Sequence, residues 1–442
     1  MGQVLRQDRP VLRPWKSNVK QTPLIAVLVA LFFVVAAWAE DWPQWRGPTR
    51  DGAWTEQGVL KTFPLGGLKF RWRMAVGPGL SSPIVAEGRV FLTDVRLTRP
   101  LTKERVLCFE AGTGKPLWTY SYDAEYPDPG PHEPTQGPIP TPICHHGKLY
   151  TIGKTDLLCL DAKSGMLLWK KSLDKEYQAQ EFLTYASPLI EGDLLIIFAG
   201  RFSGDATDCV IAIDKDSGKT VWRALTDYGA ISSPIIVSAA ERRQLIVWSQ
   251  QAVTSLDAAT GNVCWREATR PQNQSSAVST PVAQGNRLLI GGLMMNLDAA
   301  KPAAAVLWPE SKSPSRRNLS NTSTPILRGD HVFSARTSGH LVCLEAATGK
   351  ELWRTDQVTE LGSGAAIHFT LNGDNTFLYT DRGELILASL SGDGYKEIGR
   401  AAVLEPTYPY DGRKFAWTPP AYADRCIFAR SEEELVCASL AE

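Results

Sequence analysis

The chain has 442 residues, 47 Lys and Arg against 47 Asp and Glu, and a hydrophobic fraction of 43%. A formal net charge of zero excludes a nucleic-acid-binding protein that depends on a strongly positive surface. The apolar content excludes a disordered polyelectrolyte, because it is sufficient to build a core. Tryptophan occurs 14 times, and its spacing indicates the fold.

Residues 1–39 have the character of an export signal. A basic stretch is followed by an apolar run from Leu24 to Trp38 and by the small-residue triplet Ala37-Trp38-Ala39. This order is typical of a signal peptide cleaved after Ala39, and it predicts a periplasmic or secreted bacterial protein. The alternative is an N-terminal membrane anchor, although the run is shorter than the roughly 20 apolar residues that span a bilayer. We expect no transmembrane segment after cleavage.

Residues 40–67 form a Trp-rich N-terminal segment, and repeats fill the chain beyond it. One motif consists of an acid, two variable residues, Ser or Thr, Gly, three variable residues and Trp. Its copies begin at Glu110, Asp161, Asp214, Asp257 and Glu345. A second element is a small hydroxyl residue before proline, found at Ser82-Pro83, Thr141-Pro142, Ser187-Pro188, Ser233-Pro234, Thr280-Pro281, Thr324-Pro325 and Thr418-Pro419.

Each repeat is predicted to form four antiparallel strands. The residues between the two motifs are short β-branched and aromatic runs bounded by turn signals, with no helical period. The first strand follows the Ser/Thr-Pro element, where proline removes no ladder hydrogen bond. The Gly of the acid-containing motif turns the third strand into the fourth. Each repeated Trp lies on the outermost strand, where burying it contributes roughly 2–3 kcal/mol. We interpret these Trp residues as packing devices and not as a ligand cage.

The spacing of the units predicts a closed ring. Seven Trp residues recur at intervals of 43 to 53 residues: Trp72, Trp118, Trp169, Trp222, Trp265, Trp308 and Trp353. An eighth unit without the Trp is expected near Ile398, and the last unit, Thr418–Leu440, has only three strands. The strand around Trp72 lacks three predecessors, so it is expected to complete that last sheet. The predicted fold class is therefore all-β: an eight-bladed propeller over residues 68–442, closed by an N-terminal strand and left without an exposed edge.

The [Ser/Thr]-Gly-x3-Trp repeats resemble those of the PQQ-like, or quinoprotein alcohol dehydrogenase-like, β-propeller family. The segment from Asp41 to Gly47 resembles a leader of secreted bacterial members, and the chain resembles BamB-like members. In the dehydrogenases of the family, the resemblance implies pyrroloquinoline quinone (PQQ) in the central channel, beneath a disulfide of adjacent cysteines and beside a calcium ion held by Glu, Asn and Asp. This sequence has no adjacent cysteines, and no Asp can be matched to the family's catalytic one. We therefore expect no cofactor, and PQQ with calcium only if the chain is a dehydrogenase.

The cysteines and histidines give no metal site. Four cysteines, Cys108, Cys159, Cys343 and Cys437, share one repeat position and read as core residues. A disulfide among the other four, Cys144, Cys209, Cys264 and Cys426, stays open. The pair His145-His146 is interpreted as the first hairpin turn of its blade and not as a zinc site.

Positions that depart from the repeat consensus are the candidate channel or ligand positions. They are Tyr185, Asn321, His368 and Trp417, each beside the start of a first strand. The Pro-rich stretch 122–140 is a second irregular region, a candidate docking loop or channel lid.

The functional prediction is an exported, non-catalytic scaffold that binds an envelope or secreted protein partner or an extracytoplasmic ligand. Resemblance to BamB-like members implies a role in envelope assembly. We expect a monomer and no nucleic acid. One alternative is a PQQ-dependent alcohol or sugar dehydrogenase. Another is a carbohydrate-binding propeller that uses Trp42, Trp45 and Trp54.

Overall fold

The computed structural model describes residues 1–2, 40–98, 101–124, 126, 137–179, 185–201, 205, 207–270, 278–313, 319 and 322–442. Residues 40–442 belong to one compact unit. The predicted signal peptide lies almost wholly outside the described residues. Within them, no helix is long and apolar enough to cross a membrane.

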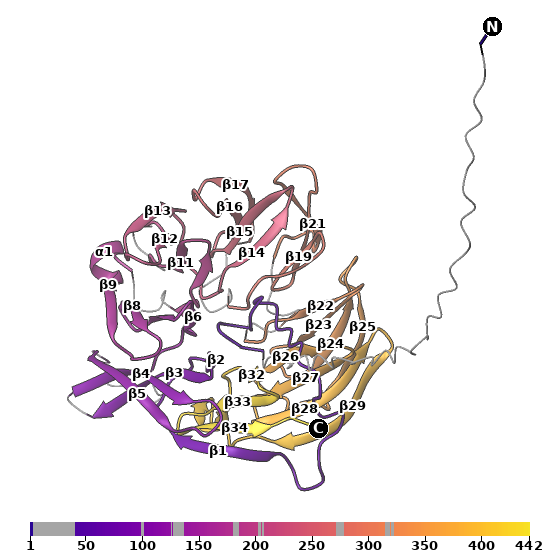
Figure 1. Ribbon diagram of the computed structural model, residues 1–442. Coiled ribbons are helices and arrows are strands. Elements are labelled where there is room, and N and C mark those ends of the chain that lie inside the picture. The colour runs from indigo at the N-terminus through magenta and orange to yellow at the C-terminus, as the bar shows by residue number, and fades with distance from the viewer. Residues whose placement is uncertain are drawn as a thin grey trace. The chain divides into compact units, whose positions relative to one another are not determined.

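Eight antiparallel sheets of four strands form the ring of Figure 1. The predicted fold class is confirmed, with eight blades. Blade 1 contains β2 (Ile84–Ala86), β3 (Arg89–Thr98), β4 (Leu101–Glu110) and β5 (Pro116–Asp123), and blade 2 contains β6 (Ile143–His145), β7 (Lys148–Ile152), β8 (Asp156–Asp161) and β9 (Leu167–Ser172). Blade 3 contains β10 (Leu189–Glu191), β11 (Leu194–Phe198), β12 (Val210–Asp214) and β13 (Thr220–Ala224), and blade 4 contains β14 (Ile235–Ala239), β15 (Arg242–Trp248), β16 (Ala252–Asp257) and β17 (Val263–Ala268).

The second half of the ring repeats this order. Blade 5 contains β18 (Val282–Gln284), β19 (Arg287–Ile290), β20 (Leu293–Leu297) and β21 (Ala304–Trp308), and blade 6 contains β22 (Ile326–Arg328), β23 (His331–Ala335), β24 (Leu341–Glu345) and β25 (Glu351–Thr355). Blade 7, the unit without a Trp, contains β26 (Ile367–Asn372), β27 (Asn375–Thr380), β28 (Glu384–Ser391) and β29 (Gly394–Ala402).

Blade 8 closes the ring with strands from both ends of the unit. It contains β32 (Ala421–Ala423), β33 (Cys426–Arg430), β34 (Glu434–Ser439) and, at its outer edge, β1 (Lys69–Ala75). β1 and β34 are antiparallel, with Met74 opposite Leu435. The closing strand predicted around Trp72 is therefore confirmed.

The Ser/Thr-Pro elements form a belt of hydrogen bonds between neighbouring blades. The backbone N–H of Ser82 donates to Oγ1 of Thr141 over 3.2 Å, and the N–H of Thr141 donates to Oγ of Ser187 over 3.0 Å. In the same way, the N–H of Ser187 donates to Oγ of Ser233 over 3.0 Å. Farther around the ring, the N–H of Thr280 donates to Oγ1 of Thr324 over 3.2 Å. Small hydroxyl residues recur here because their side chains satisfy buried backbone N–H groups of the preceding blade.

The repeated Trp residues pack against the next blade, as predicted. The indole N–H of Trp118 donates to the carbonyl of Ala162 over 3.2 Å, and its ring lies against Gly165 in the same turn. Trp265 is an exception, because blade 5 lacks the Ser/Thr-Gly turn, and its indole bonds Oε1 of Gln244 instead.

Replacing Gly165 with Ala is expected to destabilise the propeller more than the same change at Gly147. Both glycines have a φ near +73°, so each substitution costs about 1 kcal/mol in backbone strain. A Cβ at position 165 would lie 2.6 Å from the ring of Trp118, whereas one at position 147 would meet nothing within 4 Å. The additional loss for Gly165→Ala should be about 1–3 kcal/mol, measured by urea unfolding. Equal losses would contradict the packing role of the Trp.

Two local features differ from the repeat pattern. The sequence showed no helical period, yet a short helix, α1 (Leu173–Tyr177), follows β9. A two-stranded hairpin, β30 (Tyr408–Tyr410) and β31 (Arg413–Phe415), is inserted between blades 7 and 8. The pair His145-His146 lies at the turn after β6, where it was predicted.

Candidate functional site

The N-terminal segment enters the central channel of the ring, and residues 40–59 are called the channel segment here. It runs through the middle of the ring ahead of β1 (Figure 1). Trp42 forms an antiparallel bridge with Val85 of β2, and the N–H of Trp54 donates to the carbonyl of Leu371 of β26 over 2.8 Å. The segment therefore adds short backbone pairings to the inner strands of blades 1 and 7.

Two of its tryptophans anchor the channel segment. Trp42 is 3% exposed and Trp54 is 1% exposed. Both rings contact Tyr422 of blade 8, with centroid distances of 5.6 Å and 5.2 Å, and Trp54 also packs on Phe377 of blade 7. Aromatic burial of this kind contributes several kcal/mol. The carbohydrate-binding alternative needs these rings to be accessible, whereas these two are core residues.

The deepest part of the channel segment reaches the hydrogen-bond belt. The indole N–H of Trp45 donates to Oγ1 of Thr280 over 2.8 Å. Arg50, which is 6% exposed, donates from Nη1 to the carbonyl of Pro188 over 2.8 Å. The segment thus contacts the starts of the first strands of blades 3 and 5.

Two arginines bring positive charge to the channel centre. Arg46 donates to the backbone carbonyls of Arg50 and Asp51. Burial lowers the pKa of Arg46 to about 10 and that of Arg50 to about 9, and the charge of Arg46 contributes to the lower value of Arg50. Among the described residues, neither guanidinium forms an ion pair with a carboxylate.

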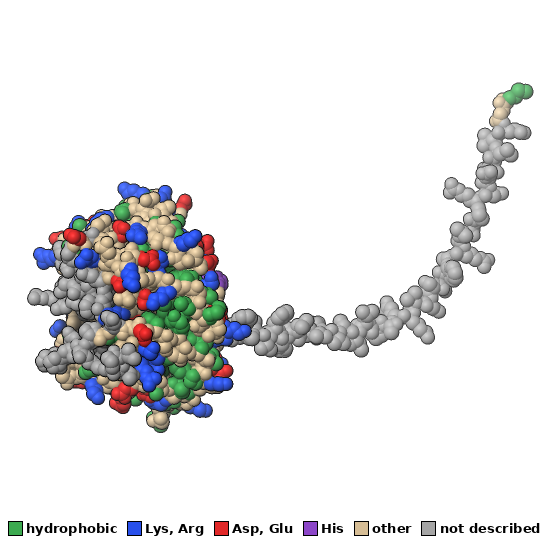
Figure 2. All heavy atoms as spheres, turned by 90° about the vertical axis from the view of Figure 1, so that its left-hand side faces the viewer, with side chains coloured by type: hydrophobic (Ala, Val, Ile, Leu, Met, Phe, Trp, Pro, Cys, Tyr) green, Lys and Arg blue, Asp and Glu red, His purple; other side chains and the backbone are tan. Residues whose placement is uncertain are grey.

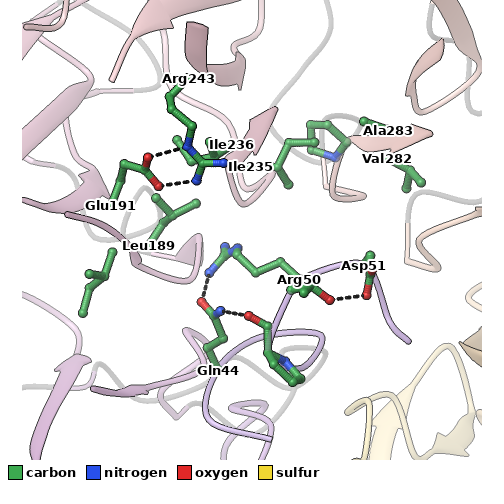
Figure 3. Close-up of a pocket in the computed structure, with 14 residues that line it drawn as sticks. Gln44, Arg50, Asp51, Leu189, Glu191, Ile235, Ile236, Arg243, Val282 and Ala283 are labelled. Atoms are coloured by element: carbon green, nitrogen blue, oxygen red, sulfur yellow. Dashed lines mark hydrogen bonds and ion pairs between the residues drawn. The ribbon is translucent and has the colours of Figure 1, made fainter. Parts of the chain in front are cut away.

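A cavity of about 410 Å³ lies between the channel segment and the first strands of blades 3, 4 and 5. The side chain of Arg50 lies between Gln44 and Leu189 (Figure 3). The ion pair of Glu191 with Arg243 lies on the far side of Leu189 from Gln44 (Figure 3). Apolar side chains of β10, β14 and β18 supply the opposite wall. The channel segment therefore leaves a pocket beside the inner strands of blades 3–5, which we call the channel cavity.

The sequence-predicted positions have different surroundings. His368 and Trp417 meet: Nε2 of His368 bonds the carbonyl of Trp417 over 2.7 Å. His368 is buried, and this burial lowers its pKa to about 4, with a further effect of the Arg46 charge. The pKa of Tyr408 is raised mainly by burial and next by the charge of Glu432. The neighbouring Tyr185 makes a smaller contribution in the same direction. Asn321 lies outside the described residues.

An aromatic cluster surrounds Trp417. Its ring lies 5.0 Å from Tyr408, 4.8 Å from Tyr410 and 5.0 Å from Phe415, all on the β30–β31 hairpin. The indole N–H of Trp417 donates to the carbonyl of Gly364 over 2.7 Å. These contacts give Trp417 a packing role, and whether it also binds a ligand stays a prediction.

The channel residues do not fit the calcium ion implied by the dehydrogenase resemblance. Calcium is bound by several carboxylate and carbonyl oxygens, whereas the side chains at the channel centre include the guanidiniums of Arg46 and Arg50. In the described part of the chain, no three His, Cys, Asp or Glu side chains form a group that could hold a metal ion. All eight cysteines are free thiols. The disulfide that the sequence left open therefore does not form among Cys144, Cys209, Cys264 and Cys426.

Sequence reasoning missed the residues that line the channel cavity. The motif around Trp42 and Trp45 was recognised as a leader, but its neighbours Gln44, Arg46 and Arg50 were not singled out. Two basic residues four apart between tryptophans were the available signal. Their importance depends on the insertion of the segment into the ring, which the repeat pattern does not contain.

The eight four-stranded sheets define a β-propeller. A family model described as outer membrane protein assembly factor BamB matches residues 102–355. The chain therefore belongs to this family of PQQ-like β-propellers.

Two curated dehydrogenases are similar in sequence. The dehydrogenase subunit of the quinone alcohol dehydrogenase of Gluconobacter oxydans is 26% identical over an alignment of 217 residues, and the match covers 45% of this chain and 27% of the relative. Quinoprotein alcohol dehydrogenase PedH of Pseudomonas putida is 27% identical over 169 residues, which are 38% of this chain and 25% of the relative. The matched part thus spans about a quarter of each relative's length.

Solved structures share the fold. BamB from Moraxella catarrhalis superposes with a TM-score of 0.53 at 16% identity, covering 84% of this chain and 99% of that one. Quinohemoprotein alcohol dehydrogenase from Comamonas testosteroni gives a TM-score of 0.62 at 13% identity, covering 91% of this chain and 80% of that one. At these identities the likeness concerns the fold alone.

Proposed function

We propose that the protein is a non-catalytic, exported scaffold that binds a protein partner in the cell envelope. The observation that carries this proposal is the channel segment, which fills part of the channel and brings two guanidiniums to its centre. The family description as an outer membrane assembly factor supports the choice, and the basic and apolar character of residues 1–39 supports export.

The outer strands support binding to another protein. Residues next to the docking Trp are exposed and apolar on several blades: Leu117 is 43% exposed, Leu168 41% and Val221 52%. Figure 2 views the side on which β5, β9 and β13 lie and shows hydrophobic side chains gathered among charged ones. Exposed apolar groups rimmed by polar residues are typical of protein-binding surfaces.

A cofactor titration tests the proposal directly. Purified protein mixed with PQQ and calcium should show no saturable change in quinone absorbance and no dye reduction with alcohols or sugars. A quinoprotein alcohol dehydrogenase treated in parallel provides the positive control. Saturable PQQ binding with turnover would overturn the scaffold and favour the second candidate, a PQQ-dependent dehydrogenase, to which the two curated relatives point.

A further inference from the structure

The channel cavity contains a buried cation whose charge is not compensated. Arg50 is 6% exposed and has no carboxylate partner among the described residues. Removing a charged group from water without an opposite charge nearby is strongly unfavourable. Carbonyl and amide oxygens reduce that cost, but they leave the positive charge in place.

The Arg50 guanidinium does not use all of its hydrogen-bond donors. Nη1 donates to Pro188 and, over 3.3 Å, to Oε1 of Gln44. Nη2 makes a long contact of 3.4 Å with the carbonyl of Ser187, and Nε has no hydrogen-bond partner although it is buried. Nε has almost no accessible surface, so the donor left for a ligand in the cavity is the second N–H of Nη2, which can form a charge-assisted hydrogen bond with a carboxylate oxygen.

The charges around the cavity do not supply the missing anion. Glu191 is held by Arg243 through two bonds of 2.7 Å. Asp51 is exposed, and its carboxylate accepts from Oγ1 of Thr49 and from the N–H of Ala53. Arg46 adds a second positive charge close to Arg50. The deep end of the cavity therefore favours an incoming anion.

The other wall of the cavity selects the body of the ligand. Leu189, Ile235, Ile236 and Val282 contribute apolar side chains from three neighbouring inner strands. Apolar surface of this kind stabilises a hydrocarbon group by removing it from water. A volume of about 410 Å³ suits a small organic molecule.

We propose that the channel cavity binds a small organic anion, a carboxylate with a short apolar body, whose carboxylate is held by Arg50. The apolar part lies against the inner strands of blades 3–5. The site goes beyond the proposed scaffold and does not depend on it, because it uses neither the outer strands nor a protein partner.

Isothermal titration of the full chain with sodium hexanoate tests the site. We expect saturable binding of hexanoate at one site per chain. Acetate lacks the apolar body, 1-hexanol lacks the charge and hexylammonium has the opposite charge, so each should bind at least about tenfold more weakly. Absence of saturable hexanoate binding, or equal binding of 1-hexanol, would overturn the proposal.

Two variants locate the binding. Arg50→Met keeps an unbranched side chain and removes the charged guanidinium, and it should weaken hexanoate binding about tenfold or more. Ile236→Trp leaves Arg50 intact and fills the cavity from a half-buried position, so it should abolish binding even if Arg50→Met fails to fold. The matched control is Val221→Trp, a similar enlargement on the exposed outer strand β13, which should leave binding unchanged. Wild-type affinity in either cavity variant would refute the assignment.

Discussion

Replacing Trp72 with Ala should destabilise the propeller by about 3–5 kcal/mol, the cost of removing a buried aromatic ring. Trp72 is 8% exposed, donates its indole N–H to the carbonyl of Ala111 over 2.9 Å and contacts Phe428. It lies on the strand that joins blade 8 to blade 1, so its loss weakens the seam that closes the ring. Urea unfolding measures the loss, and hydrogen exchange of residues 69–75 shows where it acts.

Trp353→Ala is the matched control for this prediction. Trp353 makes the corresponding bond to the carbonyl of Ser391 over 2.9 Å, between blades that the chain connects directly. This variant should lose stability while the amides of β1 keep their protection at low denaturant. If β1 exchanges equally slowly in both variants, the closing role of Trp72 is wrong.

Acidification from pH 7.5 to 4.5 should lower the free energy of unfolding through His368 by about 2–3 kcal/mol. In the unfolded chain, the imidazole of His368 has a pKa near 6.5. In the folded protein, burial lowers the pKa of the same imidazole to about 4. The unfolded state therefore binds more protons than the folded state between these two pH values. The contribution of His368 to the free energy of unfolding is complete above pH 6.5 and is lost as the pH falls toward 4. Urea unfolding at the two pH values provides the measurement.

His368→Gln isolates this contribution. Glutamine retains an N–H donor for the carbonyl of Trp417 but does not titrate, so the variant should lose less stability on acidification than the wild type. The control is His146→Gln, in the exposed turn after β6, which should behave like the wild type. Identical acid sensitivity of wild type and His368→Gln would show that His368 is not the responsible group.

The ring was predictable because its information is local and repeated. The Ser/Thr-Pro element fixes the start of each first strand, and the Gly before Trp118 or Trp169 fixes a turn and a docking contact at constant spacing. The same spacing located blade 7 without its Trp, since β29 contains Ile398 at the expected position. Closure of the ring followed from counting strands. The last sheet has only three strands from the C-terminal end of the chain, so its fourth strand had to come from the N-terminal end.

The channel was not predictable in the same way. Residues 40–59 have no repeat, and the position of Arg50 depends on contacts with blade 3 across 137 and 138 residues of chain. His368 and Trp417 were identified as departures from the consensus, and the structure brings them together. Their hydrogen bond joins a side chain of β26 to a backbone carbonyl beyond the β30–β31 hairpin, which no pattern in the sequence indicated.

Pairing of β1 with β34 imposes a delay on biogenesis. Arg73 and Glu434 form an ion pair across 361 residues of chain. The first strand to be synthesised, β1, can therefore pair only after the last strand, β34, has been made. At about 5–20 residues per second, that interval is roughly 20 to 70 s. Throughout it, β1 lacks its neighbour, and its unpaired backbone groups and Trp72 are available to other unfolded chains. A holding chaperone that shields this first strand would therefore raise the yield of closed rings.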